Sequence, residues 1–479
     1  MSASPLRQSA VAVPVCIDLD GTLITGDLLW ESFVTLFRQQ PLMAMLLALS
    51  VVKGRAHFKR RVAEQVAIDP GDLPYRQELI DELNGLHRQG VPLLLATASH
   101  ESYARAVSTH LGIFQEVVAS DGRRNVSGRA KAAMLVERFG EGGFDYIGND
   151  WADVPVWRMA ATPTVVGGSP GLVRHLTSER SNARVLATRR SPIAALLAAI
   201  RPHQWAKNAL VFIPIVAGHQ LLQVNALWSA TLTFVAFSLC ASAIYILNDI
   251  SDVRADRKHS RKSRRPFAAG ELSIPAGVAV AAALLLTSGL LAFVGVSWQV
   301  GAILGVYVLV TSAYTLRLKR VPVADVFTLT GLYVLRILAG AVATVTSLTT
   351  WLLAFALFFF LGLAFVKRYV EVMSTRGQLP GREYGPEDAQ WMQAIGTSAS
   401  YMAVVVLALY VNTPEVTQLY SQPEVLWLLC PVLLFWSTRL WFRAGRRLLH
   451  DDPVVEALKD PLGYVTLAAA SIILMIAAV

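Results

Sequence analysis

The segment YILNDISDVRADRKHSRKSRRP (245–266) places amide and carboxylate side chains directly before a run of basic ones. On a helix, Asn248, Asp252 and Asp256 turn by only about 40° at each step of four residues, and Asp249 lies within about 100° of Asn248. Carboxylates gathered on one face repel each other unless a cation joins them. Their hard oxygen atoms suit Mg²⁺, which prefers to share its coordination shell with substrate phosphates. The spacing therefore predicts a magnesium site formed by Asn248, Asp249, Asp252 and Asp256.

Basic residues that follow these acids could bind the same phosphates from the other side, arginine through bidentate contacts. The candidates are His259, Arg261, Lys262, Arg264 and Arg265. The alternative is a solvated loop in which acids and bases neutralise each other and the cations only set the orientation of the chain in a membrane.

Two further carboxylates, Asp18 and Asp20, lie near the end of the apolar run VPVCIDLDGTL (13–23). A β-branched run of this kind predicts a buried parallel strand that delivers both side chains to the carboxyl edge of a sheet, where α/β folds place their sites. The sequence predicts two more such strands, over 91–99 and 144–150. Between them it predicts two helices, over 99–112 and 130–140. This alternation predicts a doubly wound α/β domain.

The composition changes near residue 190. The whole chain is 54% hydrophobic and only 16% charged, against about 25% charged residues in an average soluble protein. Long apolar runs dominate from about residue 200 onward, and nine of them are long enough to predict membrane spans. These runs are 205–221, 227–247, 275–295, 298–315, 324–344, 348–366, 392–411, 424–442 and 462–479. The predicted fold class is therefore an α/β domain followed by an all-α polytopic membrane bundle.

Lysine and arginine occur in the loops after the second, fourth, sixth and eighth spans and are absent from the other loops between spans. This positive-inside pattern predicts an integral protein of a bacterial-type cytoplasmic (inner) membrane, with the N-terminal domain in the cytoplasm. The same loops account for the net charge of +9, which argues against a nucleic-acid partner. Cys16, Cys240 and Cys430 are isolated in the sequence, so neither a disulfide framework nor a cysteine metal cluster is predicted.

The acidic run after the second span resembles the first Asp-rich motif of the UbiA superfamily of intramembrane prenyltransferases. The resemblance covers about 196–479 and implies a helical bundle with a central cavity open to the bilayer, in which Mg²⁺ holds a diphosphate leaving group. Six stretches resemble one branch, the decaprenyl-phosphate phosphoribosyltransferases: RPHQWAKN (201–208), DRKHSRKSRRPFAAG (256–270), YTLRLKRVPVADV (314–326), LRILAG (335–340), VKRYVE (366–371) and DDPVVEALKDP (451–461).

That branch implies transfer of phosphoribose from phosphoribosyl pyrophosphate to a polyprenyl phosphate lipid, with Asp252 and Asp256 as catalytic residues. Further residues are expected at the substrate or its phosphates: Lys207, Asn208, His259, Lys262, Arg265, Tyr314, Lys319, Asp325, Arg336 and Lys367. Five of them also have a structural alternative: Lys207, Tyr314, Asp325, Arg336 and Lys367. Asp325 and Arg336 could pair with each other, and Tyr314 and Lys367 could be interfacial anchors.

Two other functions stay open. The first is transfer of a polyprenyl group from its diphosphate to an aromatic or other acceptor. Prenyl-transferring members of the superfamily usually carry a second Asp-rich motif with two acids four residues apart. Here Asp325 is the first acid of such a pair, and Leu329 occupies the position of the second. The second is a transporter or scaffold without enzymatic activity, which would need polar groups at several membrane depths.

The N-terminal motif VPVCIDLDGTL resembles the haloacid dehalogenase superfamily of phosphohydrolases, over residues 11 to about 175. The resemblance implies that Asp18 is the nucleophile and forms an aspartyl-phosphate, while Asp20 is the general acid/base. It implies that Thr97 donates to the phosphoryl group and that Lys131 neutralises its charge. The implied Mg²⁺ ligands are Asp18, Asp20, Asn149 and Asp153. Asn149 stands where the family usually has an acid, and its amide oxygen can still bind Mg²⁺.

These signals divide the chain into a hydrolase-like domain over 1–175 with a helical cap over about 27–88, a linker over 176–195, and a membrane domain over 196–479. The cap contains PLMAMLLALSVV (41–52), which is too short to span a bilayer. We expect this stretch to be a buried cap helix or one that touches the membrane. Fusion of the two domains suggests that the phosphatase removes the 5-phosphate of the lipid product.

Overall fold

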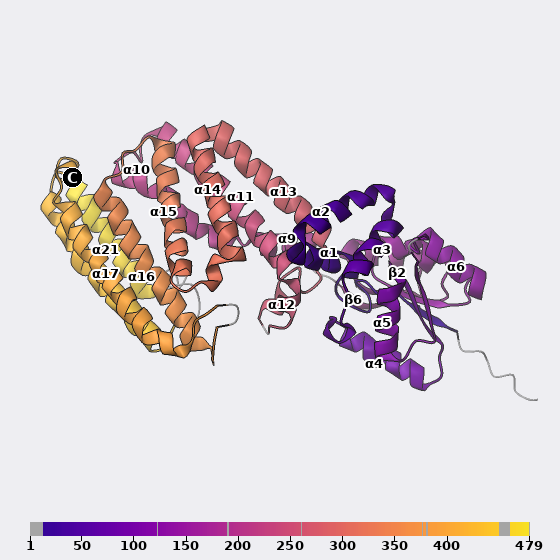
Figure 1. Cartoon of the computed structure of the whole chain (residues 1–479). Helices are drawn as coiled ribbons and strands as arrows, with labels where there is room; N and C mark the ends of the chain where they lie inside the picture. The colour runs from indigo at the N-terminus through magenta and orange to yellow at the C-terminus, as the bar shows by residue number, and fades with distance from the viewer. Residues whose placement is uncertain are drawn as a thin grey trace, which may run out of the picture. The chain divides into compact units, whose positions relative to one another are not determined.

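A computed structural model of the chain describes residues 13–121, 123–188, 191–259, 261–375, 377–379, 382–449 and 460–478. The chain divides into two compact units. The first unit comprises Met1–Arg201 and Ser242–Ala282, and the second comprises Pro202–Ala241 and Ala283–Val479 (Figure 1). The predicted motif DDPVVEALKDP lies almost entirely outside the described residues.

A six-stranded parallel sheet forms the centre of the first unit. Its strands are β1 (Val15–Ile17), β2 (Leu93–His100), β3 (Glu116–Ser120), β4 (Asp145–Gly148), β5 (Pro163–Gly168) and β6 (Arg184–Thr188). Their order is β3-β2-β1-β4-β5-β6, and Cys16 of β1 lies opposite both Leu94 and Tyr146. The three predicted strands are confirmed as β1, β2 and β4. Because the chain winds outward in opposite directions from β1 and β4, the loops that leave these two strands separate and open a crevice at the carboxyl edge.

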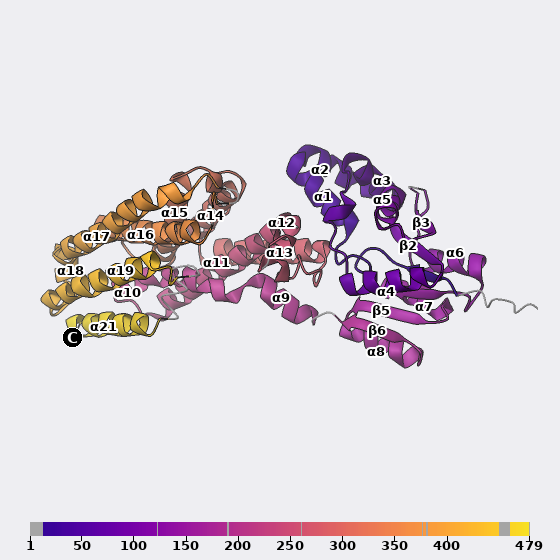
Figure 2. The same ribbon diagram turned by 90° about the horizontal axis from the view of Figure 1, so that it is seen from below.

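Helices cover both faces of this sheet. On one face, α4 (Gln77–Arg88) and α5 (Glu101–Leu111) pack Leu83 and Val107 into a core that contains Ile17. On the other, α6 (Arg129–Phe139), α7 (Val154–Met159) and α8 (Pro170–Glu179) pack around Cys16. Cys16 and Ile17 point to opposite faces because side chains alternate along a strand. Figure 2 shows α8 beside β5 and β6. The prediction of a doubly wound α/β domain is confirmed.

The helical insertion after β1 is smaller than predicted. It consists of α1 (Leu28–Gln39), α2 (Pro41–Leu49), η1 (Ser50–Lys53), α3 (Arg55–Gln65) and η2 (Pro70–Asp72). Helix α4 had been counted within the predicted cap, but it covers the sheet instead.

The predicted linker over 176–195 is also different in the structure. It contains the end of α8, strand β6 and the start of α9 (Pro192–Ile200). Strand β6 pairs with β5 through Val185 opposite Val165, and Arg184 forms an ion pair with Glu82 at 2.9 Å. Charged side chains are common on edge strands, which explains why this segment looked like a polar linker.

Eight helical segments of the described chain are long and apolar enough to cross a membrane. They are α11 (Val224–Ser251), α13 (Ile274–Leu290) continued by η6 (Leu291–Val296), α14 (Trp298–Leu316), α15 (Ala324–Thr344), α16 (Thr350–Ser374), η8 (Pro386–Asp388) with α17 (Ala389–Val411), η9 (Pro423–Leu428) with α19 (Leu429–Gly445), and α21 (Pro461–Ala478). They match eight of the nine predicted spans.

The first predicted span, 205–221, is not a single helix. The chain forms the 3₁₀ helix η4 (Pro202–Phe212) and then the short helix α10 (Ile213–Ala217). Pro214 has no N–H group to continue a helical ladder across this junction. The prediction of nine spanning helices is therefore corrected to eight among the described residues.

The largest core of the second unit lies around α16 and α17, which run side by side in Figures 1 and 2. Phe365 and Tyr369 of α16 pack with Met392 of α17 and Trp441 of α19. Large apolar side chains such as Leu309 remain exposed on the outside. An apolar exterior of this kind suits a lipid environment, where backbone groups must be satisfied inside helices.

Candidate active sites

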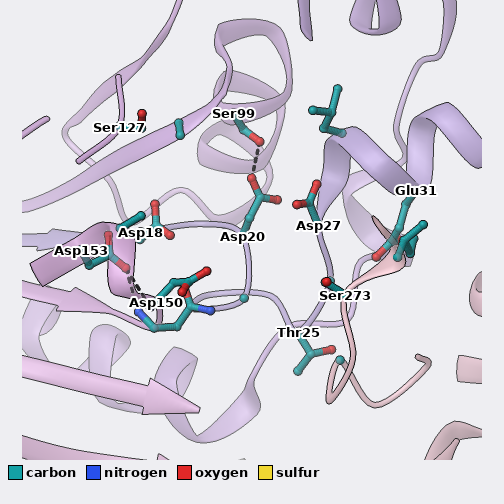
Figure 3. Close-up of a pocket in the computed structure, with 18 of the residues that line it drawn as sticks. Asp18, Asp20, Thr25, Asp27, Glu31, Ser99, Ser127, Asp150, Asp153 and Ser273 are labelled. Atoms are coloured by element: carbon teal, nitrogen blue, oxygen red, sulfur yellow. Dashed lines mark hydrogen bonds between the residues drawn. The ribbon is translucent and has the colours of Figure 1, made fainter. Parts of the chain in front are cut away.

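A cavity of about 240 Å³ lies at the crevice between β1 and β4 in the first unit. Figure 3 shows Asp18 and Asp20 after β1, Ser99 at the end of β2, and Asp150 and Asp153 after β4 around this space. The fold thus brings residues at or after the ends of three strands to the place that the strand order favours for a ligand.

Lys131 forms the buried electrostatic centre of this site. Its Nζ donates to Asp18 Oδ1 at 2.8 Å and to the hydroxyl of Tyr146 at 2.7 Å, and that hydroxyl donates to Asp153 Oδ1 at 2.8 Å. Burial by itself lowers the pKa of Lys131, but the carboxylates of Asp18 and Asp153 outweigh it and raise that pKa above its ordinary value. Lys131 therefore stays charged beside the carboxylate that would attack a phosphoryl group.

Asp153 holds the loop after β4 in shape. Its Oδ2 accepts from the backbone N–H groups of Asn149, at 3.0 Å, and Asp150, at 3.2 Å. Both of its oxygens are thus bonded within the protein. This geometry fits a role in presenting Asn149 and Asp150, and the predicted role of Asp153 as a metal ligand stays a prediction.

Asp20 is held by two donors from different elements. The backbone N–H of Leu28 donates to Oδ1 at 2.8 Å, and the Ser99 hydroxyl donates to Oδ2. Burial raises the pKa of Asp20 to about 7, and the nearby charge of Asp27 adds to the effect. Burial likewise raises the pKa of Asp18 to about 7, although Lys131 opposes the shift. A carboxyl group that can carry a proton near neutral pH suits general acid/base work.

The donor atoms around the cavity suit a magnesium ion. Asp18, Asn149 and Asp150 bring carboxylate and amide oxygens to its wall, and the burial of Asp18 makes unbalanced negative charge there costly. Within the described residues, however, no three or more His, Cys, Asp or Glu side chains are gathered as a metal site. An ion would therefore draw part of its coordination from the Asn149 amide and from substrate oxygens.

The sequence prediction selected Thr97 where the structure brings Ser99 to the cavity. Thr97 is fully buried and its hydroxyl accepts from the backbone N–H of Ser99 at 3.0 Å. The sequence also missed Lys59 of α3, whose Nζ donates to the carbonyl of Ala98 at 2.5 Å. The alternation of side chains along β2 offered a signal for Ser99, since Thr97 and Ser99 share a face.

The Asp-rich segment lies at the junction of α11 and α12 (Val253–Arg257). The buried carboxylate of Asp249 accepts from Arg201 at 2.6 and 2.7 Å and from Arg265 at 3.1 Å. Arg265 also donates to buried Asp256 at 2.7 Å. The more exposed Asp252 lies 3.7 Å from Arg38. Asp249 and Asp256 therefore converge as the spacing predicted, but on arginine, so here acids and bases neutralise each other.

A second ion pair connects this segment to α1 within the first unit. Arg257 Nη1 and Nη2 each donate to Glu31 at 2.8 Å, and Arg257 Nε donates to the carbonyl of Ala268 at 3.0 Å. The side chains of Arg257 and Glu31 are only 12% and 4% exposed. His259 and Lys262, predicted to bind phosphate, lie on the exposed surface.

In the second unit, Asp325 is fully buried among partners that the sequence did not single out. One oxygen lies 2.7 Å from Arg368 Nη2 and 3.3 Å from Arg382 Nη1, and the other accepts from the Tyr384 hydroxyl at 2.7 Å. The Arg382 guanidinium also donates to the Tyr314 hydroxyl at 3.4 Å. Arg368 directly follows the predicted Lys367 in VKRYVE, and the sequence did not single out Arg368.

The suggested pairing of Asp325 with Arg336 is wrong. Eleven residues on a helix correspond to about 16 Å along its axis, too far for direct contact. Arg336 instead donates to Asn208 Oδ1 at 2.7 Å and to the Tyr307 hydroxyl at 3.0 Å. Asn208 and Arg336 are thus brought together as a buried polar pair.

The remaining predicted residues of the second unit are partly buried at helix ends or within helices. Lys207 lies in η4, Lys319 in η7 (Leu318–Arg320) and Lys367 in α16. Their predicted contacts with substrate stay predictions.

Two family models match the chain in separate regions. The UbiA prenyltransferase family model matches residues 211–447, and the haloacid dehalogenase-like hydrolase model matches residues 15–158. The uncharacterized protein y4nM of Sinorhizobium fredii is 35% identical over 460 residues, which cover 94% of this chain and 88% of that protein. The chain belongs to the UbiA prenyltransferase family and carries an N-terminal haloacid dehalogenase-like domain.

Other relatives align with parts of this UbiA-family protein. Decaprenyl-phosphate phosphoribosyltransferase of Corynebacterium glutamicum is 36% identical over 181 residues, 37% of this chain and 54% of that enzyme. A UbiA homolog from Archaeoglobus fulgidus bound to GPP and Mg²⁺ has a TM-score of 0.46 at 16% identity, covering 59% of this chain and 99% of that one. The UbiA-family membership and the apolar helices identify an integral membrane enzyme, a transferase with a hydrolase-like domain.

Proposed function

We propose that this UbiA-family enzyme transfers 5-phosphoribose from phosphoribosyl pyrophosphate to a polyprenyl phosphate at the cytoplasmic face of a bacterial inner membrane. The hydrolase-like domain then removes the 5-phosphate of the lipid-linked product. The observation that carries the first step is the relationship to decaprenyl-phosphate phosphoribosyltransferase. The second step is supported by the cavity that gathers Asp18, Asp20 and Lys131.

The transfer step needs stabilisation of charge more than proton transfer. Attack by a lipid phosphate oxygen on the anomeric carbon breaks the bond to diphosphate, and the sugar passes through an oxocarbenium-like state. The nucleophile is already an anion, so no general base is required. Magnesium bound by Asn248, Asp252 and Asp256 would stabilise the leaving diphosphate. Arg265 would bind diphosphate oxygens, and orientation of the two substrates supplies much of the remaining acceleration.

The phosphatase step follows from the contacts of the buried cavity. The Asp18 carboxylate attacks phosphorus, and the bond to the ribose 5-oxygen breaks as Asp20 donates a proton to that oxygen. Lys131 stabilises the negative charge on the transferring phosphoryl group. Water then hydrolyses the aspartyl-phosphate, with Asp20 accepting its proton. Ser99 and Leu28 hold the Asp20 carboxyl group in position for both transfers.

The surroundings of Asp325 favour phosphoribosyl transfer over prenyl transfer. A second acidic metal site would need Asp325 to face the substrate with another acid nearby. Instead its carboxylate is satisfied by Arg368, Arg382 and Tyr384. Asp325 thus supports the fold of the bundle, in keeping with the absence of the paired acid at position 329.

The test is to incubate the purified protein with Mg²⁺, polyprenyl phosphate and radiolabelled phosphoribosyl pyrophosphate and to analyse the lipids. We expect a labelled lipid in the native protein, about 100-fold less with Asp256→Asn, and accumulation of the 5-phosphorylated lipid with Asp18→Asn. A product formed only from polyprenyl diphosphate would establish prenyl transfer instead. Uptake without any covalent product would indicate a transporter.

A further inference from the structure

Helix α2 presents an apolar surface that the first unit does not cover. Leu42, Met45, Leu46 and Leu49 of α2 and Val52 of η1 are 60–92% exposed. We call these five residues the apolar face. Single exposed hydrophobic residues are ordinary on a protein surface, but a contiguous group of this size marks a contact with another molecule or with a membrane.

Only a narrow side of α2 contributes to the protein core. Ala44 and Leu47 are buried against Leu36 and Val66, and the sequence from Pro41 to Leu49 contains no polar side chain. The stretch is much shorter than the roughly 20 residues that span a bilayer. The helix therefore has the length and composition of one that lies along an interface.

The flanking charges indicate the chemistry of the partner. Residues 38–62 contain six lysines and arginines and no aspartate or glutamate. Lys53 and Arg55, next to the apolar face, are exposed. Basic residues beside an apolar helix face attract anionic lipid headgroups, at about 1 kcal/mol per residue near the surface. An aqueous protein partner would instead need a complementary acidic and apolar surface.

We propose that α2 and η1 insert the apolar face at the boundary between headgroups and acyl chains of an anionic bilayer, with Lys53 and Arg55 at the phosphate level. The membrane helices of the same chain keep this surface close to a bilayer, so a weak intrinsic affinity is sufficient. Helix α1, which precedes α2, lines the phosphatase cavity with Leu29 and Glu31. If the proposed function holds, this docking keeps the cavity at the surface where a lipid-linked phosphate ester lies.

The test uses the full chain in nanodiscs of phosphatidylglycerol and phosphatidylcholine. A bimane label is attached to Leu46→Cys, or to Arg88→Cys as a control at an exposed position of α4. Native Cys16, Cys240 and Cys430 are buried, so labelling is directed to the introduced thiol. We expect nitroxide-bearing lipids to quench the label at position 46 and not at position 88. Quenching at 46 should weaken in pure phosphatidylcholine.

Absence of lipid quenching at position 46, together with full quenching by aqueous iodide, would overturn the proposal. Cross-linking between two copies of the Leu46→Cys variant without lipid quenching would identify a second chain as the partner and would also overturn it. These quenching and cross-linking results do not depend on enzymatic activity, so they test membrane docking independently of the proposed function.

An activity measurement tests the consequence of docking. The triple variant Leu42→Ser/Leu46→Ser/Leu49→Ser should dephosphorylate the phosphoribosyl lipid about tenfold more slowly, through lost positioning, and should hydrolyse p-nitrophenyl phosphate at the native rate. Equal rates on the lipid for native and substituted protein would refute this consequence. If the native protein cleaves p-nitrophenyl phosphate but not the lipid, the proposed phosphatase step fails while the quenching result still decides docking.

Discussion

The buried ion pair of Asp325 and Arg368 gives a sharp test of how the second unit is stabilised. Both side chains are 0% exposed, and their charged atoms lie 2.7 Å apart. Replacing Asp325 by Asn keeps the shape of the side chain and removes its charge. The Arg368 guanidinium then remains buried without its full counter-charge, which is far more costly than the pair itself is favourable.

We expect Asp325→Asn to lower the free energy of unfolding by about 3–5 kcal/mol, the range for breaking one partner of a buried pair. Glu371→Gln is a matched control, because it makes the same chemical change opposite the same arginine. The Glu371 side chain is 31% exposed, so solvent screens its interaction and the loss should stay below about 1 kcal/mol. The assay is denaturant-induced unfolding of the purified protein in mild detergent.

A double-mutant cycle with Asp325→Leu and Arg368→Met completes this test. The combined variant removes both buried charges and should be more stable than either single variant, because the remaining charges of Arg382 and Glu371 lie 3.8 Å apart and can pair. The reasoning would be refuted if Asp325→Asn were as stable as the control, or if the two single losses simply added in the double variant.

Four further predictions follow from specific contacts. Lys131→Met should lower the phosphatase kcat by about 10²–10³-fold without changing phosphoribosyl transfer, as measured by separate assays of the two steps. Ser99→Ala removes a donor to Asp20 and should lower the same kcat by about tenfold or more, with little effect on substrate KM in steady-state kinetics. Gly340→Ala would place a Cβ 2.1 Å from the Val211 carbonyl oxygen and should destabilise the protein by about 1–3 kcal/mol, whereas Gly331→Ala on the same helix meets no atom within 4 Å and should unfold like the native protein. Glu31→Gln leaves buried Arg257 without its counter-charge and should cost about 3–5 kcal/mol of unfolding free energy, against less than about 1 kcal/mol for Lys258→Ala, which breaks an exposed pair with Asp72.

The sequence predicted most of the fold because its signals were local. An apolar run that ends in DLDGT identified β1, and uninterrupted apolar runs identified the eight membrane helices. The apolar run over 205–221 wrongly predicted a spanning helix. Its average hydrophobicity is high, but this average does not detect the change from 3₁₀ to α geometry at Phe212. Strand β6 was missed because an edge strand with Arg184 and polar neighbours lacks the apolar signal of a central strand.

The partners of charged residues were harder to predict than the residues themselves. Asp325 was recognised as a polar residue within a membrane span, but its partners Arg368, Arg382 and Tyr384 come from 43 to 59 residues further along the chain. The helical and strand periods of a sequence relate only residues a few positions apart, so they cannot predict these pairs. The Arg336–Asn208 pair shows the same difficulty across 128 residues. Sequence periodicity can therefore identify a buried charge, while only the tertiary packing identifies what neutralises it.

The arginines of the Asp-rich segment give a physical account of how such a site can exist before substrate arrives. Buried Asp249 and Asp256 would repel each other, but Arg265 contacts both and Arg201 contacts Asp249. Under the proposed function, a magnesium diphosphate brings a cation for the acids and an anion for Arg265 at the same time. Each charge then exchanges one partner for another, so neither binding nor release leaves an isolated charge in a buried environment. Lys131 and Asp18 in the hydrolase-like domain are arranged on the same principle. Under the proposed function, we therefore expect each site to bind magnesium and a phosphate group together more readily than either one alone.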